Sequence, residues 1–277
     1  MKVYSLFSGS SANCILVKGR RGSILIDAGG SVKKIRSALA ALNMTPRDIS
    51  AIFVTHEHTD HVKALPMISK KYAIPIHMTE KSAEFFVQTE DDAGICPIIC
   101  HTPIFGEEVC GMKITSFPTS HDSVCCIGYT IEEDGEKIGI ATDTGTVTDE
   151  MEAAMRGSRG VLIEANYDRD MLRGGIYPAR LKARISGARG HLCNDDCAAF
   201  ALRLAESGTK SFLLCHLSAE NNRPELATAA VMSALREGGF RNIRVSAADR
   251  NSVSELADNA EASDFSDFCP ADLKGGF

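Results

Sequence analysis

The sequence predicts an α/β fold, because short apolar segments rich in β-branched residues alternate with segments of helical periodicity. Polar residues, mainly His and Asp, directly follow several of these apolar segments, as expected where strands end at a functional site. The chain has 277 residues, of which 44% are hydrophobic, so it can bury a substantial core. We therefore expect one domain over residues 1–256.

The N-terminal part is expected to form three strands and a helix. The strands are predicted at residues 3–7, 14–17 and 23–30. A loop of small residues over 8–13 joins the first two and can approach a ligand closely. Ser31 can cap the helix, and Asn43 and Pro46 end it. The Gly29-Gly30 pair lacks the G-x-G-x-x-G spacing, so we exclude a dinucleotide-binding loop.

The stretch Thr55–His61 packs three imidazoles and a carboxylate into six consecutive positions. An apolar run precedes it and is predicted to be a strand. Strand alternation directs His56 and His58 to one face, and a tight turn could return Asp60 and His61 to the same point. Imidazole and carboxylate ligands without thiolate suit zinc, manganese or iron in an open catalytic site. The alternative is a solvated polar loop, which the apolar run disfavours.

The middle of the chain continues the βαβα alternation. We predict a helix, a strand, a helix and a further strand at residues 62–72, 74–78, 81–88 and 111–118. The last of these leads to His121, which could supply a third neutral nitrogen beside His56 and His58. His77 is interpreted as structural, and His101 lies in a Pro-flanked loop without a partner motif.

A hairpin is predicted from two strands that flank Asp134-Gly135, a strong turn signal. The strands span residues 127–132 and 137–141. The second leads to Asp143, and this strand-Asp-Gly unit echoes the one at Asp27.

The C-terminal part adds two further strand ends with titratable groups. A strand over 160–166 contains Glu164, and a buried carboxylate there requires a partner. A strand over 210–215 leads to His216. The other expected elements are a helix from Asp149 to Gly157, a helix capped by Asn194 and ended by Gly208, a helix near 224–237, a strand over 243–247 and a tail from 257 to 277 with the composition of a mobile terminus.

Composition narrows the classes of partner. A net charge of −6 and a pI near 5.8 argue against nonspecific adhesion to nucleic acid or anionic membranes. Residues 156–189 nevertheless hold eight basic and three acidic residues, which could track phosphates or form an ordinary solvated surface. The N-terminus lacks the apolar region of a signal peptide, and no apolar run approaches membrane-spanning length. We expect a cytoplasmic protein without a membrane partner.

The ten cysteines are expected to be reduced thiols, since a cytosolic chain rarely builds a disulfide framework. The pairs Cys96/Cys100 and Cys193/Cys197 are each separated by three residues, which on a helix is the spacing of core positions. We therefore expect core thiols rather than metal ligands.

The residues at the strand ends form one set: His56, His58, Asp60, His61, His121, Asp143 and His216. The H-x-H-x-D-H signature, followed by a later His, an Asp and a final His, resembles the metallo-β-lactamase superfamily. The resemblance implies an α/β fold arranged as a four-layer αββα sandwich. Within the superfamily, Gly190-His191-Leu192 and the stretch 216–222 most resemble the YycJ/WalJ branch, which is related to the tRNase Z-type phosphodiesterases.

The resemblance also implies two divalent metal ions and a role for each ligand. One ion would be held by His56, His58 and His121, and the second by Asp60, His61 and His216, with Asp143 bridging. A hydroxide between the ions would attack a phosphodiester, and Asp60 would orient or deprotonate the attacking water.

The same comparison implies that His191 contacts the phosphate and protonates the leaving oxygen. Glu164 would hold the imidazole and raise its proton affinity. The alternative is a structural Glu at a strand end beside a surface His.

These features favour a dinuclear phosphodiesterase that acts on nucleic acid, DNA rather than RNA, as an exonuclease. A small-molecule thioesterase or cyclic phosphodiester hydrolase is the alternative. A flavodiiron-type redox site is disfavoured because that pattern has Glu at the place of His58, and a non-catalytic signalling scaffold is disfavoured by the complete ligand set. The 73 residues from Asp143 to His216 leave no room for the inserted domain of the β-CASP nucleases. The long arm of tRNase Z is likewise not evident in the sequence.

Overall fold

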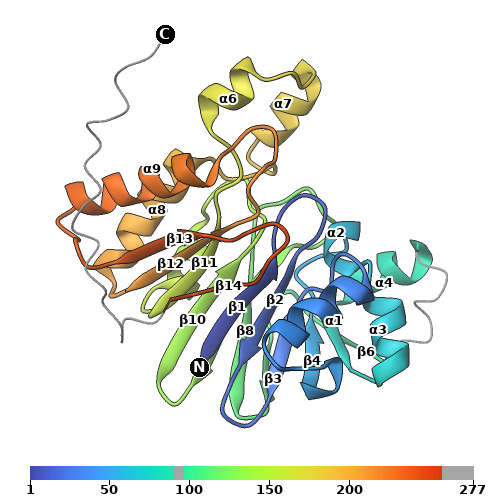
Figure 1. Ribbon diagram of the computed structural model, residues 1–277. Helices are drawn as coiled ribbons and strands as arrows, with labels where there is room; N and C mark the ends of the chain where they lie inside the picture. The colour runs from blue at the N-terminus through green and yellow to red at the C-terminus, as the bar shows by residue number, and fades with distance from the viewer. Residues whose placement is uncertain (90–96, 258–277) are drawn as a thin grey trace.

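The computed structural model describes residues 1–89 and 97–257, which form two seven-stranded sheets packed face to face with helices outside (Figure 1). This arrangement confirms the predicted αββα layers. The predicted tail lies, from residue 258 onward, outside the described residues, as does Cys96. No helix within the described ranges combines the length and hydrophobicity that crossing a bilayer requires.

The first sheet contains the N-terminal strands and has a parallel half, β3 to β6. Its strands in spatial order are β14 (Ser254–Glu255), β1 (Lys2–Phe7), β2 (Cys14–Lys18), β3 (Ser23–Ile26), β4 (Ile49–Phe53), β5 (Ile76–Thr79) and β6 (Ile98–His101).

The second sheet mirrors this plan, with a parallel half from β10 to β13. Its strands in order are β13 (Arg244–Ala247), β12 (Ser211–Cys215), β11 (Gly160–Glu164), β10 (Glu136–Ala141), β9 (Ile127–Glu133), β8 (Met112–Pro118) and β7 (Gly106–Val109). The predicted hairpin is β9–β10, and its turn places Asp134 and Gly135 at φ of 52° and 79°, as the Asp-Gly pair favours.

Most helices cover the outer faces of the two sheets, whereas α6 and α7 project beyond the strand ends (Figure 1). They are α1 (Val32–Ala41), the 3₁₀ turn η1 (Pro46–Asp48), α2 (Thr59–Val62), α3 (Leu65–Tyr72), α4 (Glu80–Thr89), α5 (Asp149–Met155), α6 (Arg169–Gly174), α7 (Ala179–Ile185), α8 (Asn194–Glu206) and α9 (Pro224–Glu237). Ser31 caps α1 as predicted, since its side chain accepts a hydrogen bond from the Lys34 N–H.

Several predicted boundaries are wrong. The expected single helix over 62–72 is two helices, α2 and α3, because Pro66 favours a new start in the first turn of α3. Thr148, not Asp149, caps α5, and Cys193, not Asn194, caps α8 through its thiol. His101 ends strand β6 rather than lying in a loop.

The core has three layers, one between the two sheets and one between each sheet and its helices. The alternation of residues along the central strands explains these layers. On β12, Phe212 and Leu214 face the helices α8 and α9, whereas Leu213 and Cys215 face the other sheet. This alternation follows from the period of two in a strand, and its continuous apolar run marks burial on both faces. Cys197 lies in the helix-side core, as expected from its spacing, but the same expectation is wrong for Cys100, which is exposed on strand β6. The described cysteines are all free thiols.

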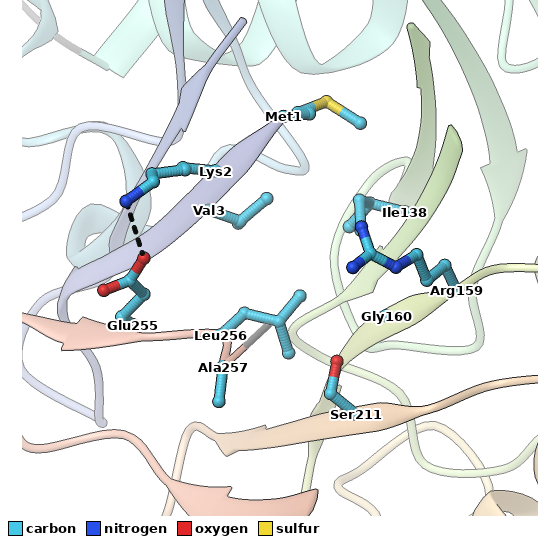
Figure 2. A pocket seen from close by; sticks show the side chains of 10 residues that line it. All are labelled: Met1, Lys2, Val3, Ile138, Arg159, Gly160, Ser211, Glu255, Leu256 and Ala257. Atoms are coloured by element: carbon cyan, nitrogen blue, oxygen red, sulfur yellow. Dashed lines mark ion pairs between the residues drawn. The ribbon is translucent and has the colours of Figure 1, made fainter. Parts of the chain in front are cut away.

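All of the parallel strands in both sheets deliver their carboxyl ends to one edge of the sandwich. The opposite end is closed by apolar side chains: Val3, Ile138 and Leu256 gather around a small pocket there, and Lys2 pairs with Glu255 at its rim (Figure 2). The titratable residues singled out in the sequence lie at the edge where the strands have their carboxyl ends.

We predict that Leu213→Ala destabilises the protein by about 2–5 kcal/mol, because Leu213 is fully buried between the sheets and its loss leaves a cavity. Urea unfolding followed by circular dichroism measures this change. The matched control is Leu226→Ala on α9, where the side chain is 40% exposed and the expected cost is about 1 kcal/mol or less. Equal costs for the two variants would contradict the assigned core.

Candidate metal centre

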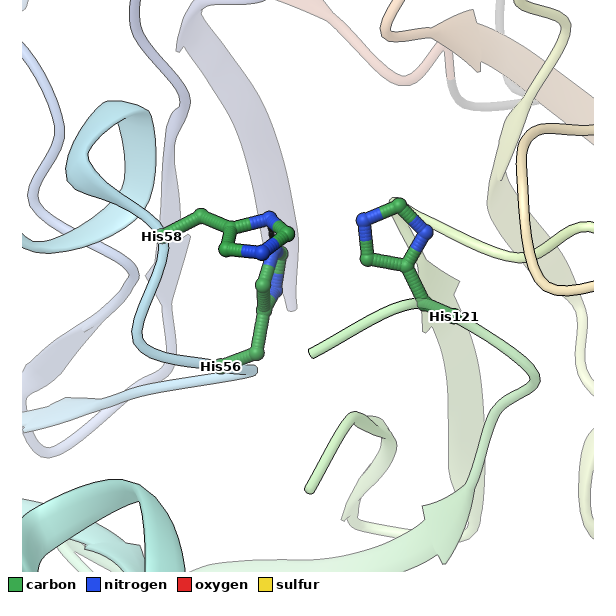
Figure 3. Close-up of side chains that lie close together, drawn as sticks. All are labelled: His56, His58 and His121. Carbon is green, nitrogen blue, oxygen red and sulfur yellow. Dashed lines mark hydrogen bonds between the residues drawn. The ribbon is translucent and has the colours of Figure 1, made fainter. Parts of the chain in front are cut away.

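Three imidazoles from the two sheets come together at the edge where the strands have their carboxyl ends. His56 and His58 follow β4, and His121 follows β8 from the other sheet, so the rings face one another across the gap (Figure 3). His56 Nε2 lies 3.0 Å from His58 Nδ1, and both ring centroids are 5.1 Å from that of His121. The His121 Nδ1–H donates to the Gly190 carbonyl at 2.8 Å, which leaves Nε2 directed at the other two rings.

The environment favours the neutral form of the first two imidazoles. Burial, and then the His61 ring, hold the pKa of His56 well below its usual value. Burial and the His121 ring lower the pKa of His58 in the same way. A neutral imidazole is the form that binds a metal ion.

A second group lies on the other side of Asp143 and consists of Asp60, His61 and His216. The predicted tight turn is the one-turn helix α2, which returns Asp60 and His61 toward the strand ends. Asp60 Oδ2 lies 3.4 Å from His61 Nε2 and 3.6 Å from His216 Nε2. The donor atoms of this group all lie within 4.8 Å of one another, as do those of the three-imidazole group.

Asp143 stands between the two groups. Its carboxylate is 2% exposed, with Oδ2 at 3.3 Å from His61 Nε2 and Oδ1 at 3.8 Å from His121 Nε2. Burial alone would raise the pKa of Asp143, but His216 and His61 hold it well below the usual value. Asp143 is therefore an ionised carboxylate in the interior.

Glu164, at the end of β11, joins two imidazoles. Its Oε1 accepts from His191 Nδ1 at 2.8 Å and from His216 Nδ1 at 2.7 Å, while Oε2 accepts the backbone N–H groups of Thr144 and Leu192. Burial opposes protonation of His191, but the Glu164 carboxylate overcomes it and raises the pKa of His191. The structure thus brings together all nine residues singled out by the sequence.

The donor set fits divalent cations. Asp143 Oδ2 and His216 Nε2 are buried and make no hydrogen bond within the described part of the chain. Burial lowers the pKa of His216, but the Asp143, Asp60 and Glu164 carboxylates raise it to about 10, because they place negative charge around the ring. A bound cation would take the place of the ring proton against that charge. A cation would satisfy both orphaned atoms and that charge, because buried charges in proteins are paired or coordinate metals.

The family model described as Beta-lactamase superfamily domain matches residues 23–217. The chain belongs to the beta-lactamase superfamily. The protein named Exodeoxyribonuclease WalJ from Streptococcus pneumoniae is 37% identical over 238 residues, which cover 84% of this chain and 87% of that protein. The one named Exodeoxyribonuclease YycJ from Bacillus anthracis is 34% identical over 239 residues, which cover 85% and 89%.

A solved structure shows the same superfamily fold. The metallo-beta-lactamase fold protein YhfI from Bacillus subtilis superposes with a TM-score of 0.69 at 17% identity and covers 92% of this chain and 98% of its own. The sandwich and the resemblance to the YycJ/WalJ branch, both predicted from the sequence, are confirmed.

Two residues that were not predicted from the sequence make hydrogen bonds to members of this site. Asp27 Oδ2 accepts from His61 Nδ1 at 2.7 Å, which turns His61 Nε2 toward Asp60 and Asp143. Asn13, in the small-residue loop, donates through Nδ2 to Asp60 Oδ2 at 3.1 Å. The echo between the strands that end at Asp27 and Asp143 was the available signal for the first, whereas a lone Asn in a loop carries none.

The backbone at this edge permits a close approach that a side chain would block. A Cβ on Gly29 would lie 1.8 Å from the Asp60 carbonyl oxygen, so only glycine fits beneath α2. Asp27 and His216 adopt φ of 61° and 54°, which is uncommon outside glycine and indicates that tertiary contacts hold both residues in place.

His77 and His101 lie outside this set. Their rings pair with each other through His77 Nδ1 and His101 Nε2 at 3.0 Å, His77 stacks on Phe53, and His101 Nδ1 lies 3.8 Å from Glu107. The structural interpretation of His77 agrees with this packing, and His101, expected to lack a partner, has one.

We predict that Glu164→Gln lowers the pKa of His191, because removing the carboxylate charge leaves burial as the main influence on the ring. In the wild-type protein the ring is charged below a midpoint that lies above 6.5 and neutral beyond it. Nuclear magnetic resonance titration of the imidazoles in metal-free protein measures both midpoints. His101 is the internal control, and an unchanged His191 midpoint would show that Glu164 does not set its charge.

Proposed function

We propose that the chain is a dinuclear metal-dependent phosphodiesterase that removes nucleotides from DNA. The observation that carries the proposal is the arrangement around Asp143: a donor group on either side of one buried carboxylate, with the Glu164–His191 pair beside it. Such a site suits in-line displacement at a phosphodiester. Similarity to two proteins named exodeoxyribonucleases supports DNA as the polymer and exonucleolytic cleavage as the mode.

The ligands divide between two cations. One cation would be held by His56, His58 and His121. The other would be held by Asp60, His61 and His216, and Asp143 would contact both. Zinc, manganese and iron all accept this donor set. When bound, the pair of cations lowers the pKa of a water molecule and neutralises charge on the phosphoryl oxygens.

Asp60 would orient the attacking water. Burial raises the pKa of Asp60, but the His61 and His216 rings lower it far more, so the carboxylate stays ionised and accepts a hydrogen bond. The Asn13 amide also donates to Oδ2. This contact restricts movement of the Asp60 carboxylate and so keeps the water aligned for attack.

His191 would protonate the oxygen that leaves the phosphorus atom. Its Nδ1 is engaged by Glu164, so Nε2 is the nitrogen available to a substrate, and the side chain is 17% exposed beside the buried ligands. Water adds to phosphorus and passes one proton by way of the Asp60 carboxylate to solvent. The P–O bond to the leaving sugar breaks, and the proton on His191 Nε2 moves to the sugar oxygen. The raised pKa keeps the proton on the ring until that moment.

The proposed function is tested with metal-analysed protein incubated with zinc or manganese and with labelled duplex DNA, single-stranded DNA, RNA and bis(p-nitrophenyl) phosphate. We expect DNA to be shortened from an end, and Asp60→Ala to abolish this because it removes a ligand and the group that orients water. Removal of the metals with a chelator should also stop digestion, and their return should restore it. Cleavage of the small ester alone would favour the small-molecule hydrolase instead.

We predict that His191→Ala lowers kcat on DNA by about 10²- to 10⁴-fold, the contribution expected of a positioned proton donor, without loss of bound metal. Single-turnover kinetics and metal analysis of the same sample measure the two effects. His101→Ala is the matched control, since that ring lies in the separate His77 pair and should leave both values unchanged. Loss of metal from His191→Ala would contradict the role given to His191.

A further inference from the structure

Helices α6 and α7 form an arm, residues 169–189, that projects beyond the carboxyl ends of the second sheet (Figure 1). The sequence analysis did not predict these helices. Ile176, at the turn between them, is 90% exposed, and α7 buries none of its residues. The arm therefore presents most of its surface to solvent rather than to the core.

The arm is nevertheless a defined structure. Leu172 packs in a small separate core with Tyr167 and Cys193, and Tyr177 and Ile185 lie against it. The Lys182 ammonium donates to the carbonyl oxygen of Arg173 at 2.8 Å and ties the two helices together. A surface held in this way can present charges at fixed positions.

The arm concentrates positive charge in an acidic chain. It contains six basic residues and one acidic residue, while the whole chain has a net charge of −6. Two of the six are matched by carboxylates outside the arm: Arg169 pairs with Asp195 and Asp196, and Arg184 with Asp122. Among the described residues, the ion-pair partner of Arg173 is its exposed neighbour Asp170, and such a pair contributes little in water.

The remaining cations have no carboxylate partner within residues 1–89 and 97–257. Arg180 is exposed on α7 and makes no ion pair with any described residue. The Lys182 ammonium donates to a carbonyl oxygen. Arg189 donates to the carbonyl oxygens of His121 and Ser123 at 3.0–3.2 Å. Their charge is therefore uncompensated locally, which is the condition for attracting a polyanion.

The arm ends directly at the candidate metal centre. The His191 N–H donates to the Ile185 carbonyl at 2.8 Å, and Arg184 reaches Asp122, the residue after His121. The close packing leaves no room for a side chain on Gly190, whose Cβ would lie 2.2 Å from the carbonyl oxygens of Arg184 and Ile185. The arm thus carries Arg180 in the first turn of α7 and, after its last helix, Arg189 on the His121 carbonyl beside the metal centre.

We propose that this arm is the surface that binds the DNA strand, with Arg180 and Lys182 on its phosphates and Arg189 guiding the end of the strand to the metal centre. The inference rests on the proposed function, since it names the surface through which that site would hold its polymer. Contacts of this kind are to phosphate and carry no sequence information, so the arm suits an enzyme that digests any sequence.

Arg180→Glu tests the arm, because the side chain is exposed, touches no described carboxylate and lies outside the catalytic set. The control is Arg47→Glu, an equal charge change on the exposed turn η1 at the amino end of β4, the edge opposite the site. Unchanged thermal unfolding of both variants would show that each is folded.

Binding is measured first, with metal-loaded protein and a fluorescent single-stranded DNA whose phosphorothioate linkages resist hydrolysis. We expect Arg180→Glu to raise Kd by about 5- to 10-fold and to reduce the slope of log Kd against log salt by about 0.7, the value of one phosphate contact on a single strand. Arg47→Glu should change neither. Equal binding by wild type and Arg180→Glu, or no binding by the wild type at about 50 mM salt, would overturn the inference.

Hydrolysis separates this inference from the proposed function. Arg180→Glu should raise KM for ordinary DNA while hydrolysing bis(p-nitrophenyl) phosphate within twofold of the wild-type rate, since that ester is too short to reach the arm. If the wild type binds the strand through Arg180 but never cuts it, the inference about the arm is supported and the nuclease proposal is contradicted. If DNA is cut equally by both proteins with equal KM, the nuclease proposal stands and the arm falls.

Discussion

The buried carboxylate of Asp143 is the constraint on which the rest of the site depends. An ionised group that is 2% exposed must be compensated, and Asp143 lies where β10 of one sheet faces the strand ends of the other. The imidazoles nearest to it, on His61, His121 and His216, come from three separate segments of the chain. The site therefore forms only where those segments converge.

Two further carboxylates orient the imidazoles that surround Asp143. Asp27 sets the ring of His61 from the first sheet, and Glu164 sets the rings of His216 and His191 from the second. Each carboxylate engages Nδ1, so Nε2 points inward, which is how outer-shell carboxylates commonly fix a metal-binding histidine. The Thr55 N–H and hydroxyl also donate to the Asp27 carboxylate, and these contacts help to hold Asp27 at its left-handed φ of 61°.

Sequence patterns predicted the parts of the molecule that depend on local order. The spacing of His56, His58, Asp60 and His61 is local and marked the site, but the expected strand alternation was wrong there, because β4 ends at Phe53 and both histidines lie in the loop that follows. The rule that strands end in functional groups at one edge of an α/β fold added His121 and His216. The role of Asp27 was missed because its echo with Asp143 marks a strand end without identifying His61 as the partner. The helices α6 and α7 were missed because they are short and lack the apolar stripe that marks a helix packed on a core. The cap of α8 was misplaced because a Cys thiol is a rare helix cap beside an Asn.

The central claim is that two cations share Asp143. Anomalous X-ray diffraction from crystals grown with manganese tests it most directly, because it locates the ions without assuming any activity. The account predicts two peaks, one among His56, His58 and His121 and one among Asp60, His61 and His216, on either side of the Asp143 carboxylate. A single peak, or peaks that do not contact Asp143, would contradict it.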